Sequence, residues 1–145
     1  MAEGLELQTL KTFATVYAFA QKALNFHWNV EGSRFVELHA LFEKASDKAW
    51  DELDCFAESI RSMNVYVPAN FTDLKALSAI QDTQNNPPAG EMLSILLNDC
   101  RIALSWLKST YKSVETANNE ALCNILSDII RKFTKIEYWL VSASK

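Results

Sequence analysis

The feature that most constrains this chain is a run from Phe35 to Met63 that contains neither glycine nor proline. Apolar residues recur in it every three to four positions, which is the spacing of one face of an α-helix, so the run predicts one long helix. The chain of 145 residues has only 3 glycines and 3 prolines, which favours long elements throughout. Long helices with short links indicate an all-α bundle, and the length suits one domain over residues 1–145.

The remainder of the chain divides into further helices and one long link. Long helical patterns extend over residues 5–29, 89–114 and 119–142, and residues 71–79 predict one short helix. The first helix has an apolar stripe made of Leu7, Leu10, Phe13, Tyr17 and Leu24. Gly32 breaks the chain after it, and Ser33 is the expected N-cap of the next helix. The link over residues 65–86 is long enough to cross a four-helix bundle whose second and third helices run parallel.

Two histidines and three carboxylates form the chemical signal of the sequence. His39 and Glu43 lie one helical turn apart, as do Asp54 and Glu58, and His27 precedes them across a short turn. However, His39 and Asp54 are roughly 22 Å apart along a helix axis. Metal–ligand bonds are only about 2.0–2.6 Å long. One chain therefore cannot bring both pairs to one metal ion, whereas two antiparallel copies related by a two-fold axis can.

Each of these residues taken alone has an ordinary structural explanation. Carboxylates one turn apart usually face water, and a protonated His27 in the last turn of a helix is favoured by the helix dipole. Taken together, imidazoles and carboxylates suit iron, manganese or zinc by ligand softness, and carboxylate-rich sites on helical bundles hold paired iron. The Glu-x-x-His motif of a site inside one bundle is missing, because Leu24 and Val36 stand three residues before the histidines. This absence favours a site at a subunit interface.

A longer signature passes through the same region. It comprises His27-Trp28-Asn29-Val30, Gly32, Phe35, Leu38-His39, Phe42-Glu43, Asp54, Ala57-Glu58 and Ile60-Arg61, and continues through Tyr66-Val67-Pro68 and the Trp139 region. This pattern resembles the Dps family (DNA-binding protein from starved cells, the mini-ferritins) over nearly the whole chain. Two positions depart from the family pattern: Ser46 stands where many members have tyrosine, and Ser59 where arginine is common. Neither position holds a metal ligand.

The resemblance implies an iron-oxidising and iron-storing mini-ferritin. Its ferroxidase ligands, carried over by position, are His27, His39, Glu43, Asp54 and Glu58, at an interface between two-fold-related subunits. The implied substrates are Fe(II) and an oxidant, preferably hydrogen peroxide and otherwise oxygen. Sites made of histidine and carboxylate also bind zinc readily, so zinc is a possible substitute metal. The implied assembly is a dodecameric hollow shell that stores ferric mineral and protects against oxidative damage.

Three further residues are weaker candidates. Trp28 and Trp50 are expected to be packing residues, although Trp28 beside a metal pair is also a candidate for quenching radicals. Glu120, Asn124 and Asp128 recur one turn apart near the start of the last helix. The resemblance implies pores at three-fold axes, for which Glu120 and Asp128 are candidates. A solvated polar face explains the same spacing.

The composition of the chain limits which partners and which cellular compartment are expected. The formal net charge of −4 opposes a general attraction to nucleic acid, and the first ten residues contain Glu3 and Glu6 but no basic side chain. DNA binding through a tail is therefore not expected, and the alternative function is a non-enzymatic DNA-compacting shell protein with a degenerate metal site. No membrane span or secretory signal is evident. The odd, widely spaced cysteines are expected to be buried, reduced thiols of a cytoplasmic protein: Cys55, Cys100 and Cys123.

Overall fold

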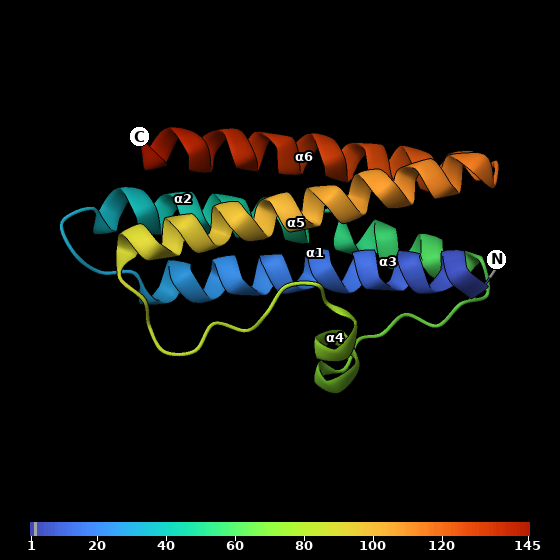
Figure 1. The fold of residues 1–145 in the computed structure, drawn as a ribbon, viewed down its shortest axis with the longest axis horizontal. Helices are drawn as coiled ribbons and strands as arrows, with labels where there is room; N and C mark the ends of the chain where they lie inside the picture. Colours follow the sequence, from blue (N-terminus) through green and yellow to red (C-terminus); the bar gives the residue numbers. More distant parts are fainter. Residues whose placement is uncertain (2) are drawn as a thin grey trace.

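Four long helical stretches lie side by side and form the bundle (Figure 1). The structure is a computed structural model that describes Met1 and residues 3–145. Its helices are α1 (Glu3–Asn29), α2 (Phe35–Trp50), α3 (Leu53–Ser62), α4 (Phe71–Leu77), α5 (Ala89–Thr116) and α6 (Glu120–Ser144). The first stretch is α1, the second is α2 with α3, and the last two are α5 and α6. The expected all-α four-helix bundle with a long crossover is confirmed.

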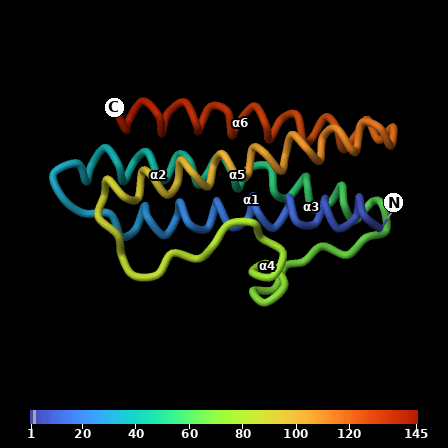
Figure 2. The backbone as a smooth tube through the Cα atoms, in the orientation of Figure 1, coloured from blue at the N-terminus to red at the C-terminus, as the bar shows by residue number. Residues whose placement is uncertain are grey.

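The crossover link between α3 and α5 makes these two elements parallel. Figure 2 shows the link leaving the end of α3, passing outside α1 and returning to the opposite end of the bundle, where α5 begins. The short helix α4 lies within the link and contacts α1. The Asn70 side chain caps α4 by accepting a hydrogen bond of 2.9 Å from the backbone N–H of Asp73. The link therefore lies against the bundle and carries an ordered helix.

The predicted helix over residues 35–63 is interrupted at Asp51 and Glu52, which separate α2 from α3. Both residues keep right-handed backbone angles, so the interruption bends the helical stretch without reversing it. Lys132 on α6 donates a hydrogen bond of 2.7 Å to Glu52 and lies 3.9 Å from the Asp51 carboxylate. No glycine or proline marks this position. The interruption coincides with a tertiary contact that the local sequence does not signal.

One local expectation about a helix start is wrong, and one about a buried face is only partly right. Ser33 is not the N-cap of α2, because Arg34 occupies that position and makes no side-chain capping bond. The expected apolar stripe of α1 is right in part: Phe13 is buried and Leu10 and Tyr17 pack against the core. However, Leu7 is exposed, and Thr9 and Thr12 are fully buried. The buried face of α1 follows Thr9, Thr12, Phe13, Val16, Phe19, Ala20, Ala23 and Phe26. Small residues on this face allow α1 to pack between α2 and α5, and those neighbours decide which side is buried.

Aromatic pairs between helices fill the core of the bundle. Phe19 on α1 packs against Phe133 on α6 with ring centroids 5.0 Å apart, and Phe26 on α1 meets Phe42 on α2 at 6.2 Å. Ser46 is fully buried and donates a hydrogen bond of 2.9 Å to the carbonyl oxygen of Ala20. A tyrosine at this position would need more room than the contact between α1 and α2 leaves.

The cysteines differ in exposure, which corrects the expectation that all three are buried. Cys100 is fully buried, Cys123 is half-buried and Cys55 is exposed. Burial raises the pKa of the Cys100 thiol to about 12, so this thiol stays protonated at neutral pH. Across Met1 and residues 3–145, no helix combines the length and the apolar character needed to cross a membrane.

Candidate metal centre

The turn between α1 and α2 brings the two histidines together. His27 lies in the last turn of α1, and His39 lies just beyond the first turn of α2. Gly32 allows the reversal because its φ of 114° is a backbone conformation that L side chains rarely adopt. Phe35 N–H donates to the Gly32 carbonyl oxygen at 3.1 Å as α2 begins. The two imidazole rings then stack with centroids 4.0 Å apart and planes 24° apart.

Reciprocal hydrogen bonds fix how the two rings present their nitrogens. His27 Nδ1 lies 2.7 Å from the backbone oxygen of His39, and His39 Nδ1 lies 2.7 Å from the backbone oxygen of His27. A carbonyl oxygen only accepts, so each Nδ1 must carry the proton and donate it. In the neutral imidazoles each Nε2 is then a bare lone pair. Metal-binding histidines use the same arrangement, in which an acceptor bonded to the other ring nitrogen sets the tautomer and orients the ring.

The three predicted carboxylate ligands are exposed on the same helical stretch. Glu43 lies on α2, and Asp54 and Glu58 lie on α3. Over Met1 and residues 3–145, none of the three takes part in an ion pair. On the same stretch, Glu37 pairs with Arg34, and Asp51 and Glu52 pair with Lys132, whereas Asp47 forms no ion pair among the described residues. These three carboxylates therefore keep their charge uncompensated within the chain.

A single chain does not complete a metal site. In the part of the chain that the structure describes, no three histidine, cysteine, aspartate or glutamate side chains lie close enough together to hold a metal ion. The structure joins His27 to His39 but leaves Asp54 and Glu58 on α3, past the interruption of the helical stretch. Any centre that uses all five residues needs ligands from a second chain.

The weaker candidates have clear positions. Trp28 is 63% exposed, so the expectation that it packs is wrong for the single chain. Trp50 packs edge-on against Tyr17 with ring centroids 4.8 Å apart, as expected. At the start of α6, Glu120 is exposed and Asp128 pairs with Arg131 at 3.0 Å. That pair is one turn apart on a single helix, so it is compatible with the solvated polar face that the spacing also allows.

A second polar cluster, which the sequence analysis missed, lies between α1, α5 and the crossover link. Lys22 on α1 donates hydrogen bonds of 2.6 Å to the Asp99 carboxylate on α5 and to the Gln81 carbonyl oxygen in the link. Burial raises the pKa of the Asp99 carboxyl, and the Lys22 ammonium opposes that shift. The sequence does carry one signal for this cluster. A lysine and an aspartate each stand at a position where the helical spacing of apolar residues predicts burial.

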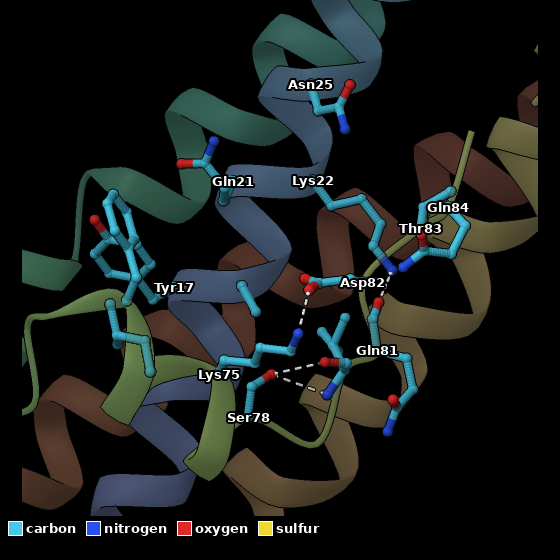
Figure 3. A pocket seen from close by; sticks show the side chains of 14 residues that line it. Tyr17, Gln21, Lys22, Asn25, Lys75, Ser78, Gln81, Asp82, Thr83 and Gln84 are labelled. Atoms are coloured by element: carbon cyan, nitrogen blue, oxygen red, sulfur yellow. Dashed lines mark hydrogen bonds and ion pairs between the residues drawn. The ribbon is translucent and has the colours of Figure 1, made fainter. Parts of the chain in front are cut away.

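A cavity of about 410 Å³ adjoins this pair (Figure 3). Its walls come from α1, α4 and the link, and the labelled Lys75 and Asp82 form an ion pair of 3.4 Å across it. None of the five predicted metal ligands lines the cavity. This cavity and the histidine pair are therefore separate features of the chain.

Comparisons with known proteins agree on the family. The model of the ferritin-like domain family, named Ferritin, matches residues 8–143. The DNA protection during starvation protein of Brevibacillus brevis is 30% identical over 122 residues, which cover 84% of this chain and 81% of that protein.

Solved structures are similar over nearly the whole chain. A Dps protein from Bacillus brevis has a TM-score of 0.89 at 26% identity, with all of both chains covered. Dps from Thermosynechococcus elongatus has a TM-score of 0.93 over 99% of this chain and 91% of that one, and its 14% identity shows the fold alone. A Vibrio cholerae Dps protein, described as a member of a broad superfamily of ferritin-like diiron-carboxylate proteins, has a TM-score of 0.91 at 22% identity, over 99% of this chain and 90% of that one.

Proposed function

This chain belongs to the Dps family of ferritin-like proteins, and on that premise we propose that it oxidises ferrous iron and stores the ferric product. The observation that most directly supports the proposal is the stacked pair of His27 and His39, in which each Nδ1 is held by the backbone oxygen of the other residue. In their neutral form both rings present a bare Nε2, yet within Met1 and residues 3–145 no third histidine, cysteine or carboxylate side chain lies close enough to complete a site. Asp54 and Glu58 on α3 are the acids that a second chain would supply.

In the proposed site, each chain contributes complementary ligands to a two-fold interface. His27, His39 and Glu43 of one chain face Asp54 and Glu58 of the other. The imidazoles hold ferrous ions through Nε2, and the carboxylates neutralise their charge. Hydrogen peroxide accepts one electron from each of two ferrous ions and, with two protons, becomes two water molecules; oxygen is the alternative oxidant. The ferric product hydrolyses and is stored as mineral, which removes ferrous ion and peroxide before they form hydroxyl radicals.

The family and the charge of the chain support this function. The Vibrio cholerae relative is described as a ferritin-like diiron-carboxylate protein. A net charge of −4 suits a protein that gathers cations. A site shared between chains requires at least a dimer, and we propose the dodecameric shell of the family in the cytoplasm. Native mass measurement tests the assembly, with a mass twelve times the 16.4 kDa of one chain expected.

Mixed oligomers test the shared site directly. Apo protein receives Fe(II) and hydrogen peroxide, and the ferric absorbance is followed over time. His39→Ala and Asp54→Ala are each expected to be inactive. After the two variants are unfolded and reassembled together in equal amounts, roughly a quarter of the wild-type activity should return, because half of randomly formed dimers are mixed and each mixed dimer has one site with all wild-type ligands.

Matched controls separate the proposal from its rivals. Glu91→Gln changes an exposed acid in the first turn of α5 and should keep full activity. No recovery in the mixed oligomer, with both single variants folded and assembled, would refute the shared site. Retention of plasmid DNA at moderate salt, together with no ferric absorbance in the wild type, would favour the DNA-compacting alternative.

A further inference from the structure

A third aromatic ring accompanies the two stacked histidines. Phe35, the first residue of α2, lies one helical turn before His39, and the centroids of the two rings are 4.8 Å apart with planes 28° apart. His27 stacks on the same imidazole at 4.0 Å. Two rings this close to one imidazole cannot share a face of it, so His39 lies between the rings of Phe35 and His27.

Core packing does not account for the Phe35 ring. Its side chain is 40% exposed and does not belong to the buried core or to the residues packed against it. The next residue, Val36, is 79% exposed, so this turn of α2 faces outward. In the single chain, a half-exposed aromatic ring whose ring partner is a stacked imidazole points to a role at that imidazole.

The stack and the hydrogen bond restrict different motions of His39. The bond from Nδ1 to the His27 carbonyl oxygen fixes which edge of the ring points toward α1. It does not prevent the ring from tilting about that bond. Rings on both faces prevent the tilt, so the direction of the Nε2 lone pair is fixed only when both restraints act. Ligands held in this way bind a metal more tightly, because less freedom is lost on binding.

We propose that Phe35 is a positioning residue for the metal ligand His39, raising metal affinity without touching the metal. The inference rests on the proposed function, because it assigns the His39 Nε2 to metal binding. Phe35 acts by stacking, so any flat aromatic ring at this position should serve, whereas an aliphatic side chain of similar size should not.

Cobalt(II) binding to the assembled protein tests the proposal without depending on turnover. Cobalt(II) chloride is titrated into the metal-free oligomer, and the visible absorption of the bound ion gives both the affinity and a signature of its ligand geometry. We expect Phe35→Leu to weaken cobalt binding about 10- to 100-fold, the effect typical of losing a group that orients a metal ligand. Phe35→Tyr, which keeps the ring, should bind cobalt within about 3-fold of the wild type.

Controls separate positioning from a merely structural role. Val36→Ala alters an exposed neighbour in the same turn and should bind cobalt like the wild type. Native mass and thermal unfolding should be the same for all these proteins, since Phe35 lies outside the core. Equal cobalt affinity in Phe35→Leu and the wild type would overturn the inference, as would equal weakening in the leucine and tyrosine variants.

The His39→Ala variant separates the proposed function from the role of Phe35. If the wild type binds cobalt and His39→Ala does not, while Phe35→Leu binds normally, the proposed function survives and the role of Phe35 fails. If the wild type binds no cobalt and oxidises no Fe(II), both fail together.

Discussion

Replacing Lys22 by methionine should destabilise the bundle far more than an ordinary substitution in a helix. Lys22 is 8% exposed and Asp99 is 5% exposed, and their charged groups meet at 2.6 Å between α1 and α5. Methionine keeps most of the volume of the lysine stem but leaves the Asp99 carboxylate buried without a countercharge. It also frees the Gln81 carbonyl oxygen, which binds the crossover link to α1 through Lys22.

Breaking a buried ion pair by removing one partner costs about 3–5 kcal/mol of unfolding free energy. For a chain of this size each kcal/mol corresponds to about 2–4 °C, so the melting temperature should fall by roughly 6–20 °C. The double variant Lys22→Met/Asp99→Val removes both charges and should lie within about 2 kcal/mol of the wild type. Thermal and guanidinium unfolding are followed by far-ultraviolet circular dichroism at one protein concentration, because assembly also contributes to stability.

The destabilisation by Lys22→Met should grow as the pH rises. Burial raises the folded-state pKa of Asp99 above 3.8, and the hydrogen bond and charge of Lys22 oppose that rise. Without Lys22 the folded pKa moves higher still. Between 3.8 and the folded pKa the native state binds more protons than the unfolded state, so stability falls as the pH rises through this window. The variant has the wider window, and its deficit relative to the wild type should be larger at pH 8 than at pH 5.

Two results would refute this reasoning. A loss below about 1 kcal/mol in Lys22→Met would mean that water reaches Asp99 and that the pair is not buried in solution. A deficit that is equal at pH 5 and pH 8 would mean that lost packing, rather than the uncompensated carboxylate, causes the instability.

Two other substitutions test the bundle and its turn. The hydroxyls of Thr12 on α1 and Thr110 on α5 form a hydrogen bond of 2.7 Å. Thr12→Val should lower the unfolding free energy by about 1–3 kcal/mol, because it leaves the buried Thr110 hydroxyl without its partner. The double variant Thr12→Val/Thr110→Val should lose less in the same unfolding assay. A Cβ at Gly32 would meet no atom within 4 Å, so Gly32→Ala should lose about 1–3 kcal/mol of unfolding free energy from backbone strain alone. Gly90→Ala in the first turn of α5 is the control and should lose none. Equal effects at the two glycines would contradict the role of the positive φ.

The sequence predicted the extents of the elements well because the signals that start and stop helices are local. The first helix was expected to end at Asn29 and the third to begin at Ala89, and both do. The last helix was expected to begin near residue 119; Asn118 has a positive φ, and the Asn119 side chain caps α6. Such signals depend on a few neighbouring residues and need no knowledge of the partners of a helix.

The candidate site was predictable in part. The proximity of His27 and His39 follows from a helix end, a glycine turn and a helix start, all readable in the sequence. The reciprocal carbonyl bonds and the Phe35 stack are not readable, because they depend on the angle at which α1 meets α2. The assignment of the carboxylates to a partner chain stays a prediction that mixed oligomers can test.

What the sequence alone determined is where this chain is helical, where it turns and which residue types gather near the first turn. Only the tertiary structure decided which face of α1 is buried, that Lys22 meets Asp99, and that Trp28 and Cys55 remain exposed. It also decided the interruption at Asp51 and Glu52 beside Lys132. The physical reason is range: helix extent is set by contacts within one or two turns, whereas the orientation of a face is set by the sum of contacts with helices far along the chain.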